Sequence, residues 1–565
     1  MAPRRVRRRS AWMVAAGLYV FAVAVNLVGI GWGLPGQGRG LLPPAAAGGI
    51  AETADRSWAA VQDPARNLNL GAPDPEQAET PARTLRRFTL YTADPDEVLT
   101  IIALARLNPF AGRWDPGITQ YGGFFLYPLG AALQLGSAAG IITARGDPSF
   151  YMAHPEAMGR IFLAGRIVVV LVSALAIPLL WAIARPIYGS RVAALAAAIG
   201  AVAPAWIVYG HILKPWAFGA PFALAALAAG RRLIASARPG RDALLAGALA
   251  GLAAGAVLVY GPVILAVWIG ITLRREGSAG RRLAWAAAAA CAAAIVVLAV
   301  QTYWLRDPAQ TMAAWRRILG WHAPDYRPAV LAAFVWGTLG CALGVPLAMA
   351  GLAEGAFQMW RSRESLPVLA PTFLMLLAAA VRTGEVPGDG IHARLIVPGA
   401  LVLAMLGAGA LWRLGRALPR FAQVLPLVLV IPTLLISGAV LRNFRAAAGI
   451  ENTRHLAGRW LNAQPEGATI GVLAPLAPFR SPLFRMDRYR VVIEPRPDQG
   501  GAAAAPEFFL VAERTSIPET PAFQARYRVA RRFAPPDPPL AQRALDLYPF
   551  ADPPITVYAR RPAPN

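Results

Sequence analysis

Residues 161 to 184 read IFLAGRIVVVLVSALAIPLLWAIA, a run of 24 residues in which Arg166 is the only charged side chain. A stretch of this length and composition is typical of a helix that crosses the hydrocarbon core of a bilayer. Similar runs recur along the 565 residues, of which 56% are hydrophobic and only 15% are charged. Because soluble proteins have about a quarter of their residues charged, the sequence predicts a polytopic α-helical membrane protein.

We expect 11 transmembrane helices. The first, from Ala11 to Leu34, follows a cluster of arginines and is interpreted as an uncleaved span whose basic end is cytoplasmic. The others are expected near 161–184, 192–209, 215–230, 243–258, 260–273, 283–302, 329–352, 366–381, 394–411 and 422–441. Residues 243–273 are expected to form a tight hairpin that turns at Tyr260-Gly261-Pro262.

The orientation depends on residues 122–143, which are apolar enough to span but contain several glycines and a Tyr-Pro pair. If they form an interfacial helix on the outer face, the later inner loops hold 15 arginines and the outer connections hold six basic residues, Arg382 among them. A spanning 122–143 reverses this positive-inside bias. We therefore predict an interfacial helix, a cytoplasmic N-terminus and location in the cell (inner or plasma) membrane.

Two regions are then expected outside the cell membrane: the loop 35–160, which belongs to a transmembrane domain 1–441, and a domain 442–565. The second reads as a small α/β domain that is exterior or periplasmic. Its helix is predicted at Asn452 to Asn462. Its strands are predicted at Thr469 to Leu473, Tyr489 to Ile493, Phe508 to Ala512, Tyr527 to Phe533 and Ile555 to Tyr558, with proline-rich turns between them.

The net charge of +24 would indicate nucleic-acid binding in a soluble protein, but here the arginines punctuate apolar runs and do not form one patch. Positive-inside topology explains them, so we predict no nucleic-acid partner. Cys291 and Cys341 both lie inside apolar runs and favour neither a disulfide framework nor a metal site. No specific cofactor is predicted: a divalent cation stays open, although no Asp, Glu or His grouping has metal-ligand spacing.

The most informative motif is Asp94-Pro95-Asp96-Glu97, which precedes a helical pattern that stops at Asn108-Pro109. As a capping box, Asp94 would be the N-cap, Pro95 would be N1 and Glu97 would be N3. That interpretation leaves Asp96 without a local structural task. Adjacent helical residues point about 100° apart, so a single base is favoured over a converging carboxylate pair. We take Asp96 and Glu97 as the catalytic candidates, with Asp96 ionised at the helix N-terminus.

The order of features resembles that of the GT-C membrane glycosyltransferases. It consists of a first span, an outer-loop Asp-Glu pair, the segment Gln120-Tyr-Gly-Gly-Phe-Phe-Leu-Tyr-Pro128, and a span introduced by Arg160 and Arg166. Within that superfamily it is similar to the dolichyl-phosphate-mannose protein mannosyltransferases and the bacterial aminoarabinose transferases. The segments His392 to Pro398 and Thr453 to Ile470 fit as well.

The resemblance implies inverting transfer of a sugar from a polyprenyl-phosphate carrier on the outer membrane face, with Asp96 at the position of the general base. The partners implied are the lipid-linked donor, an acceptor that is a lipid, glycan or protein, and the membrane. The sequence lacks the usual aromatic residue after the Asp-Glu pair and has an extended insertion before it, so the acceptor, and whether the sugar is a hexose or a pentose, cannot be carried over.

A departing lipid phosphate needs cations, and the expected threading gathers several at the outer face. Lys214 is the only lysine in the chain, beside His211 and between two spans. Arg394, Arg166 and His392 are the other donor phosphate-binding candidates. The alternatives are a snorkelling interfacial cation for Lys214, an anchor of a helix end among headgroups for Arg394 and a hydrogen-bonded spacer for His392. Arg166 is expected to face a cavity or to be ion-paired, because a buried charge is costly.

Tyr121, Tyr127 and Asp115 are candidates for an acceptor or sugar groove. The two tyrosines also suit an interfacial helix whose rings lie at headgroup level, and Asp115 followed by Pro116 also suits a turn.

Two other function classes remain open at this point. A transporter or flippase for lipid-linked sugars would show two related halves with midplane ionisable residues, whereas the polar candidates here gather at one surface. A non-catalytic membrane protein would use the Asp94 to Glu97 motif only as a helix cap.

Overall fold

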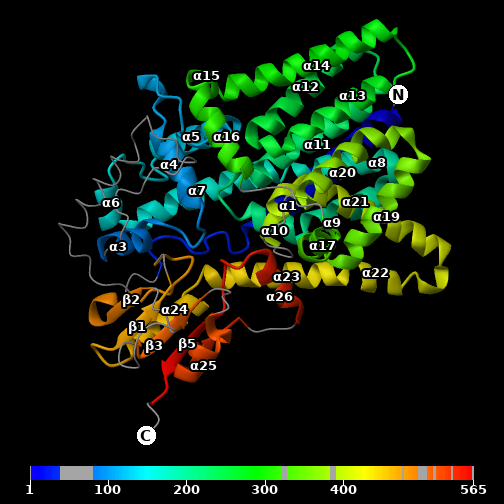
Figure 1. Cartoon of the computed structure of the whole chain (residues 1–565). Helices are drawn as coiled ribbons and strands as arrows, with labels where there is room; N and C mark the ends of the chain where they lie inside the picture. Colours follow the sequence, from blue (N-terminus) through cyan, green and yellow to red (C-terminus); the bar gives the residue numbers. More distant parts are fainter. Residues whose placement is uncertain are drawn as a thin grey trace.

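The computed structural model describes residues 2–37, 81–320, 327–381, 390–473, 476–493, 505–512, 517–535 and 539–562. Most of these residues are helical, and a five-stranded sheet lies near the C-terminus. Figure 1 shows a large helical body with the sheet below it and with α26 lying apart from the strands, beside α23. The coarse prediction, a helical membrane protein with a small C-terminal α/β region, agrees with this architecture.

The helical body contains a helix at each of the expected apolar runs. Its helices are α1 (Ala2–Leu27), α7 (Pro155–Ser173), α8 (Ala176–Tyr188), α9 (Ser190–Ala201), α10 (Pro204–Gly210), α11 (Pro215–Leu233), α12 (Pro239–Ala256), α13 (Ile264–Thr272), α14 (Ala279–Val300), α17 (Pro328–Ala333), α18 (Gly340–Leu343), α19 (Val345–Arg361), α20 (Leu366–Ala380), α21 (Val397–Ala417), α22 (Val424–Leu429) and α23 (Ile431–Ala447). Short helical turns join some of them: η4 (Leu258–Val263), η5 (Phe334–Leu339), η6 (Arg363–Ser365), η7 (Gly390–Ile396) and η8 (Pro419–Phe421).

By length and composition, four helical segments among the described residues are apolar enough to cross a membrane: Pro155–Tyr188, Ala279–Val300, Arg363–Ala380 and His392–Ala417. Two bent pairs raise the number to six if each is one span. The expected total of 11 therefore stays a prediction. Arg382, which was assigned to an outer connection, lies outside the described residues.

The segment expected as one span at 329–352 is broken. The helices Pro328–Leu343 and Val345–Arg361 meet at an angle of 107°. Gly344 lies at the break with φ +79°, a left-handed conformation that glycine adopts without strain, and Pro346 follows at the start of α19. The glycine and the proline, which a hydropathy profile does not reveal, thus decide where this apolar segment bends.

Small residues let the helices of the body approach closely. A Cβ on Gly247 would lie 2.2 Å from the Ala289 carbonyl oxygen, and one on Gly251 would lie 2.6 Å from that of Ala293. These contacts pack α12 against α14, as small residues do between membrane helices. Only 6% of the α14 apolar window is buried inside the protein, so α14 has the surface expected of a lipid-facing helix.

The region between α1 and α7 contributes α3 (Pro81–Leu90), α4 (Glu97–Arg106), η3 (Pro109–Ala111), α5 (Gly123–Ala138) and α6 (Pro148–Ala153), and α15 (Tyr303–Arg306) and α16 (Pro308–Gly320) follow α14. The start of α5 needs glycines: a Cβ on Gly122 or Gly123 would lie 1.8 Å from the carbonyl oxygen of Gly255 or Val300. This close approach places Tyr121 against the ends of α12 and α14.

The C-terminal region confirms the five predicted strands and the predicted helix. The elements are α24 (Thr453–Asn462), β1 (Thr469–Val472), η9 (Met486–Arg488), β2 (Arg490–Ile493), β3 (Phe508–Val511), η11 (Ile517–Glu519), α25 (Pro521–Arg526), β4 (Tyr527–Phe533), α26 (Pro539–Leu547) and β5 (Ile555–Arg560). The strand order is β2-β1-β3-β5-β4. Strands β1, β2 and β3 are parallel, whereas β5 pairs antiparallel with β3 and with β4.

Part of the C-terminal region packs into the core of the helical body. Ala544, Leu547, Tyr548 and Ala551 belong to the large buried cluster of the helical body, while the strands have separate clusters. Helix α26 contacts α23, α18 and η7. Helix α26 is therefore part of the core of the helical body. The division of the chain into domains 1–441 and 442–565 stays a prediction.

Candidate active site

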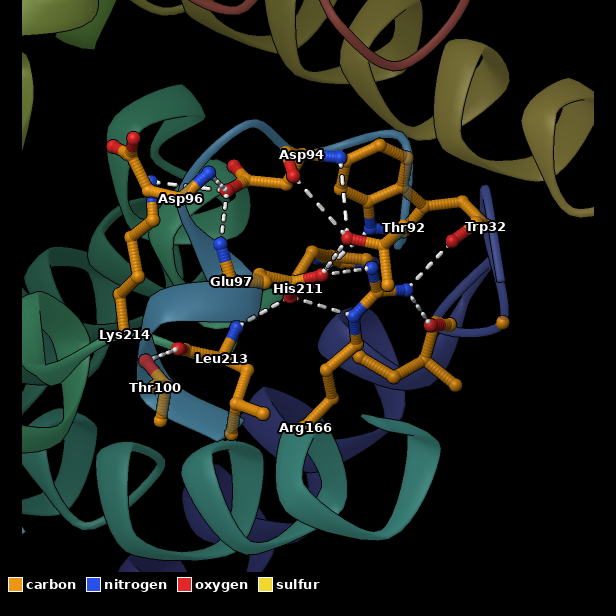
Figure 2. A network of polar contacts seen from close by, with 12 residues as sticks. Trp32, Thr92, Asp94, Asp96, Glu97, Thr100, Arg166, His211, Leu213 and Lys214 are labelled. Carbon is orange, nitrogen blue, oxygen red and sulfur yellow. Dashed lines mark hydrogen bonds and ion pairs between the residues drawn. The ribbon is translucent and has the colours of Figure 1, made fainter. Parts of the chain in front are cut away.

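The acidic motif forms the beginning of α4. The helix starts at Glu97, two residues later than expected, with Asp96 as the N-cap. Oδ1 of Asp94 accepts hydrogen bonds from the backbone N–H of Asp96 at 2.8 Å and of Glu97 at 2.9 Å. Asp94 thus does the capping, whereas the Asp96 side chain makes no cap bond and points to Lys214 (Figure 2).

Glu97 is held by a buried ion pair. Nε of Arg166 donates to Oε1 of Glu97 at 2.8 Å and Nη2 donates to Oε2 at 2.6 Å, and both side chains are fully buried. Thr92 Oγ1 donates to Oε2 and the Leu213 N–H donates to Oε1, each at 2.6 Å. Burial alone would raise the pKa of Glu97, but Arg166 and these hydrogen bonds hold it below its ordinary value.

Arg166 continues the network away from the surface. Its Nη1 donates to the carbonyl oxygens of Ile30 at 2.9 Å and Trp32 at 2.7 Å, and its guanidinium lies 4.6 Å from the centre of the Trp32 ring. Because the side chain is fully buried and paired with Glu97, Arg166 ties the acidic loop to the segment that follows α1. The ion-paired alternative fits this placement, and a direct phosphate contact does not.

Lys214 bridges the other two carboxylates of the motif. Its Nζ lies 3.1 Å from Oδ1 of Asp94 and 3.0 Å from Oδ2 of Asp96. Lys214 is the N-cap of α11, one residue after the Leu213 N–H that binds Glu97. The α10–α11 connection and the acidic loop thus hold each other through three carboxylates.

The three carboxylates differ in exposure and in proton affinity. The side chains of Asp94 and Glu97 are fully buried, whereas 38% of the Asp96 side chain is exposed. Burial raises the pKa of Asp94 above its ordinary value, although the Lys214 ammonium acts against it. Burial also acts to raise the pKa of Asp96, but the positive charges of Lys214 and Arg394 outweigh this effect and hold the pKa below its ordinary value. Asp96 is therefore ionised at neutral pH.

Sequence reasoning missed Tyr548, which comes from the far end of the chain. Its hydroxyl donates to Oδ2 of Asp94, 454 residues away in sequence. The ring packs edge-on to Trp32, with centroids 5.6 Å apart, and lies 5.9 Å from the Phe444 ring. No local pattern around Tyr548 distinguishes it from other tyrosines, so only the tertiary fold reveals this contact.

The remaining predicted cations lie at the turn η7. Arg394 is half-buried, with its guanidinium 5.8 Å from the Trp216 ring, and it is one of the charges that lower the pKa of Asp96. Its Nε is buried and has no hydrogen-bond partner in the described part of the chain. His392 is half-buried two residues earlier. His211, by contrast, is fully buried, and its ring nitrogens face the carbonyl oxygens of Ile207 and Val28.

The three candidates for an acceptor or sugar groove have different surroundings. Tyr121 is buried, and burial raises its pKa well above the ordinary value, with charges of Lys214 and Asp96 close enough to contribute. Tyr127 is half-buried, and its hydroxyl donates to the Trp114 carbonyl oxygen at 3.0 Å. Asp115 Oδ1 accepts a hydrogen bond from the Gly117 N–H at 2.7 Å, a contact that fits the interpretation of Asp115 as a turn residue. Only Tyr121 lies near the acidic cluster.

Within the described ranges, no group of three or more His, Cys, Asp or Glu side chains is arranged to hold a metal ion. The chemistry that the cluster offers is that of one partly exposed, ionised carboxylate that contacts an ammonium and is influenced by the charge of the Arg394 guanidinium.

Comparison with known proteins gives one family match and a set of distant structural likenesses. Residues 157–304 match the family described as dolichyl-phosphate-mannose-protein mannosyltransferase. No curated protein matches the sequence.

Two solved structures illustrate the distant likenesses. ArnT from Cupriavidus metallidurans, bound to undecaprenyl phosphate, is 16% identical with a TM-score of 0.43, over 82% of this chain and 93% of that one. The archaeal oligosaccharyltransferase AglB from Archaeoglobus fulgidus, in complex with an inhibitory peptide and a dolichol-phosphate, is also 16% identical with a TM-score of 0.42. That match covers 78% of this chain and 64% of AglB.

This chain therefore spans less than two thirds of the archaeal oligosaccharyltransferase chains that it matches, 62% of one and 64% of another. The family match lies on α7 to α15, which include the span that carries Arg166 and the connection that carries Lys214. It confirms the resemblance predicted from the sequence and supports a membrane glycosyltransferase of the GT-C superfamily.

Proposed function

We propose that this protein transfers a sugar from a polyprenyl-phosphate carrier to an acceptor hydroxyl at the outer face of the cytoplasmic membrane, with Asp96 as the general base. In the proposed step, the acceptor oxygen forms a bond to the anomeric carbon while the bond from that carbon to the phosphate oxygen breaks. The hydroxyl proton passes to Asp96 and the lipid phosphate leaves with the electron pair. A single displacement of this kind inverts the anomeric configuration.

The observation that carries the proposal is the exposure of one carboxylate among three. Asp94 and Glu97 are buried and engaged by protein donors, whereas 38% of the Asp96 side chain is exposed. A general base must reach the proton that it removes and must be ionised before it does so. The partial exposure of Asp96 and its lowered pKa support this role, and its position is the one that the resemblance assigns to the base.

The cations support the other half of the reaction. Negative charge grows on the phosphate as the sugar leaves, and fixed positive groups stabilise that charge. We favour Arg394 as the cation because it is half-buried, lowers the pKa of Asp96, and has a buried Nε without a hydrogen-bond partner among the described residues. Lys214 is already shared by Asp94 and Asp96, so we propose that it sets the geometry of the carboxylates and adds to the local positive charge.

Glu97 and Arg166 enter the proposal as positioning residues. Their buried pair joins the acidic loop to α7, and Glu97 also fixes the α10–α11 connection through the Leu213 N–H. Neither side chain is exposed, so neither is proposed to contact the donor or the acceptor.

The test is transfer by purified protein reconstituted in liposomes, with a panel of radiolabelled polyprenyl-phosphate sugars and with membrane lipid, glycan and peptide acceptors. We expect one label to move, and Asp96→Asn to reduce the rate at least about 100-fold, the lower range for loss of a general base. Asp147→Asn is the matched control, because Asp147 is an exposed aspartate in the same outer region. Transfer by Asp96→Asn at the wild-type rate would remove Asp96 from the mechanism.

A further inference from the structure

The C-terminal segment around Tyr548 reaches the acidic loop and forms part of its surroundings. Helix α26 lies along α23 in Figure 1, away from the strands that precede and follow it in sequence. Nη1 of Arg543 donates to the Trp336 carbonyl oxygen at 2.6 Å, which fixes α26 to η5. Directly after α26, the Tyr548 side chain enters the large buried cluster and is only 4% exposed.

The residues after Tyr548 are held on their other side by α24. Oδ1 of Asp552 accepts hydrogen bonds from the N–H and the hydroxyl of Thr453, at 2.9 Å and 2.8 Å. Nη2 of Arg454 donates to the Phe550 carbonyl oxygen at 2.8 Å. The segment 548–552 is thus fixed between the helical body and the first helix of the α/β region, so the position of Tyr548 is defined from both sides.

The Tyr548 hydroxyl completes the shell of Asp94. Oδ1 of Asp94 receives the N–H groups of Asp96 and Glu97 and faces Lys214 Nζ, while Oδ2 receives the Tyr548 hydroxyl. A buried carboxylate is costly unless its oxygens are paired. Without the hydroxyl, Oδ2 of a fully buried side chain would lose the donor that stabilises its charge.

The charged and titratable groups around Asp94 make its ionisation consequential. The pKa of Asp94 is influenced by Lys214, Glu97, Asp96 and Tyr548. The pKa of the Tyr548 hydroxyl is influenced in turn by Arg166. While Asp94 is ionised, the Lys214 ammonium is shared between two carboxylates. If Asp94 became protonated, the ammonium would pair with Asp96 alone, and the base would be less able to accept a proton.

We propose that Tyr548 is a positioning residue of the acidic site: its hydroxyl keeps Asp94 in the ionised, oriented state in which Lys214 is divided between Asp94 and Asp96. The consequence for catalysis rests on the proposed function, whereas the contact itself does not. The C-terminal segment is then a component of the active site and not only part of a separate exterior domain.

The first test measures the contact without catalysis. Thermal unfolding midpoints of the full chain in detergent are compared for wild type and Tyr548→Phe between about pH 4 and pH 8. The hydroxyl stabilises ionised Asp94, so the midpoint difference should be largest at neutral pH and shrink as Asp94 protonates at acid pH. In an Asp94→Asn background the difference should no longer vary with pH, because the amide oxygen can still accept the hydroxyl but does not titrate.

Tyr489→Phe is the matched control. The Tyr489 hydroxyl donates to the Leu461 carbonyl oxygen at 2.7 Å, an acceptor that does not titrate. Its removal should lower the midpoint by a similar amount at every pH and in both backgrounds. A Tyr548→Phe difference that behaves like this control, constant with pH and unchanged by Asp94→Asn, would overturn the proposal.

The second test uses the pH profile of sugar transfer. Tyr548→Phe should lower kcat about tenfold near neutral pH, the scale of one hydrogen bond to a charged group, and move the acid limb of the profile to higher pH. The KM for the donor should stay unchanged.

Three outcomes of the second test are distinguishable. A wild type that transfers no sugar contradicts the proposed function, and the unfolding test then decides the contact alone. An active wild type whose Tyr548→Phe variant has the same profile contradicts the positioning role. An equal loss of kcat at all pH values would also contradict it, because that indicates a merely structural defect.

Discussion

Three carboxylates within four residues have three different environments here. Asp94 is fully buried and caps α4, Glu97 is fully buried against Arg166, and Asp96 is partly exposed beside Lys214. Their roles follow from these environments more than from their chemistry, since all three are the same functional group. At the scale of residues, a substitution at each position should therefore give a different phenotype.

Arg394→Ala should weaken donor binding more than it slows the chemical step. Its guanidinium is the proposed contact to the carrier phosphate, and loss of a charge-assisted hydrogen bond should raise the KM for the donor about tenfold or more. Steady-state kinetics of the reconstituted protein measure the effect, with the exposed Arg145→Ala as control. An unchanged KM would place the phosphate contact elsewhere. Lys214→Ala is less informative, since it also disturbs Asp94 and Asp96.

Glu97→Gln should destabilise the protein strongly. The substitution leaves the fully buried Arg166 guanidinium without its counter-charge, which costs about 3 to 5 kcal/mol when a buried pair is broken. The effect should depend on pH. The folded-state pKa of Glu97 is lowered from 4.5, so its ionisation contributes stability fully above pH 4.5 and loses that contribution as the pH falls through the lower folded value.

Thermal unfolding in detergent measures this difference. The midpoint gap between wild type and Glu97→Gln should be constant from pH 5 upward, on the order of several degrees, and narrow below pH 4.5. Glu156→Gln, at an exposed glutamate in the same outer region, should show no comparable gap. A gap that widens on acidification would contradict the assignment of the buried pair.

At the scale of elements, the apolar runs and the proline-rich turns predict helices and strands well, because both signals are local. All five strands of the sheet and helix α24 lie where the sequence places them. The break at Gly344 and the packing of α26 on α23 were not predictable in this way. The first depends on a backbone angle within an apolar run, and the second on contacts between residues far apart in the chain.

Gly344→Ala should destabilise the bent pair of helices. The residue has φ +79°, and a Cβ there would lie 3.2 Å from both the N and Oγ1 atoms of Thr433. The strain should cost about 1 to 3 kcal/mol. Thermal unfolding in detergent measures it. Gly438→Ala is the control, because that helical glycine has no atom near its Cβ position and alanine there should be neutral or slightly stabilising. Equal midpoints for Gly344→Ala and wild type would contradict the strained geometry.

The candidate site shows the same division between local and long-range information. Asp96, Lys214 and Arg394 could be chosen from the sequence, because a motif, a unique residue and a span boundary mark them. Their proximity, and the pairing of Glu97 with Arg166, required the fold. Tyr548 carries no mark at all, since its relevance comes only from a contact across 454 residues.

At the scale of the whole molecule, the proposed threading places the acidic site on the outer face. In a background with Cys291→Ala and Cys341→Ala, a cysteine at Phe110 should react with an impermeant maleimide from outside intact cells, because this side chain is fully exposed. A cysteine at the exposed Ser190 should react only after the inner face is opened. The reverse pattern would invert the topology and the proposed side of transfer.

The lone lysine gives the protein a built-in chemical reporter. An acylating reagent that attacks neutral amines has a single side-chain target in all 565 residues. The Lys214 side chain is only 7% exposed, and its ammonium is paired with two carboxylates that keep it protonated and unreactive. Any event that separates the two carboxylates from Lys214 would allow this one side chain to be acylated. Intact-mass measurement could therefore follow the opening of the cluster before a substrate is known.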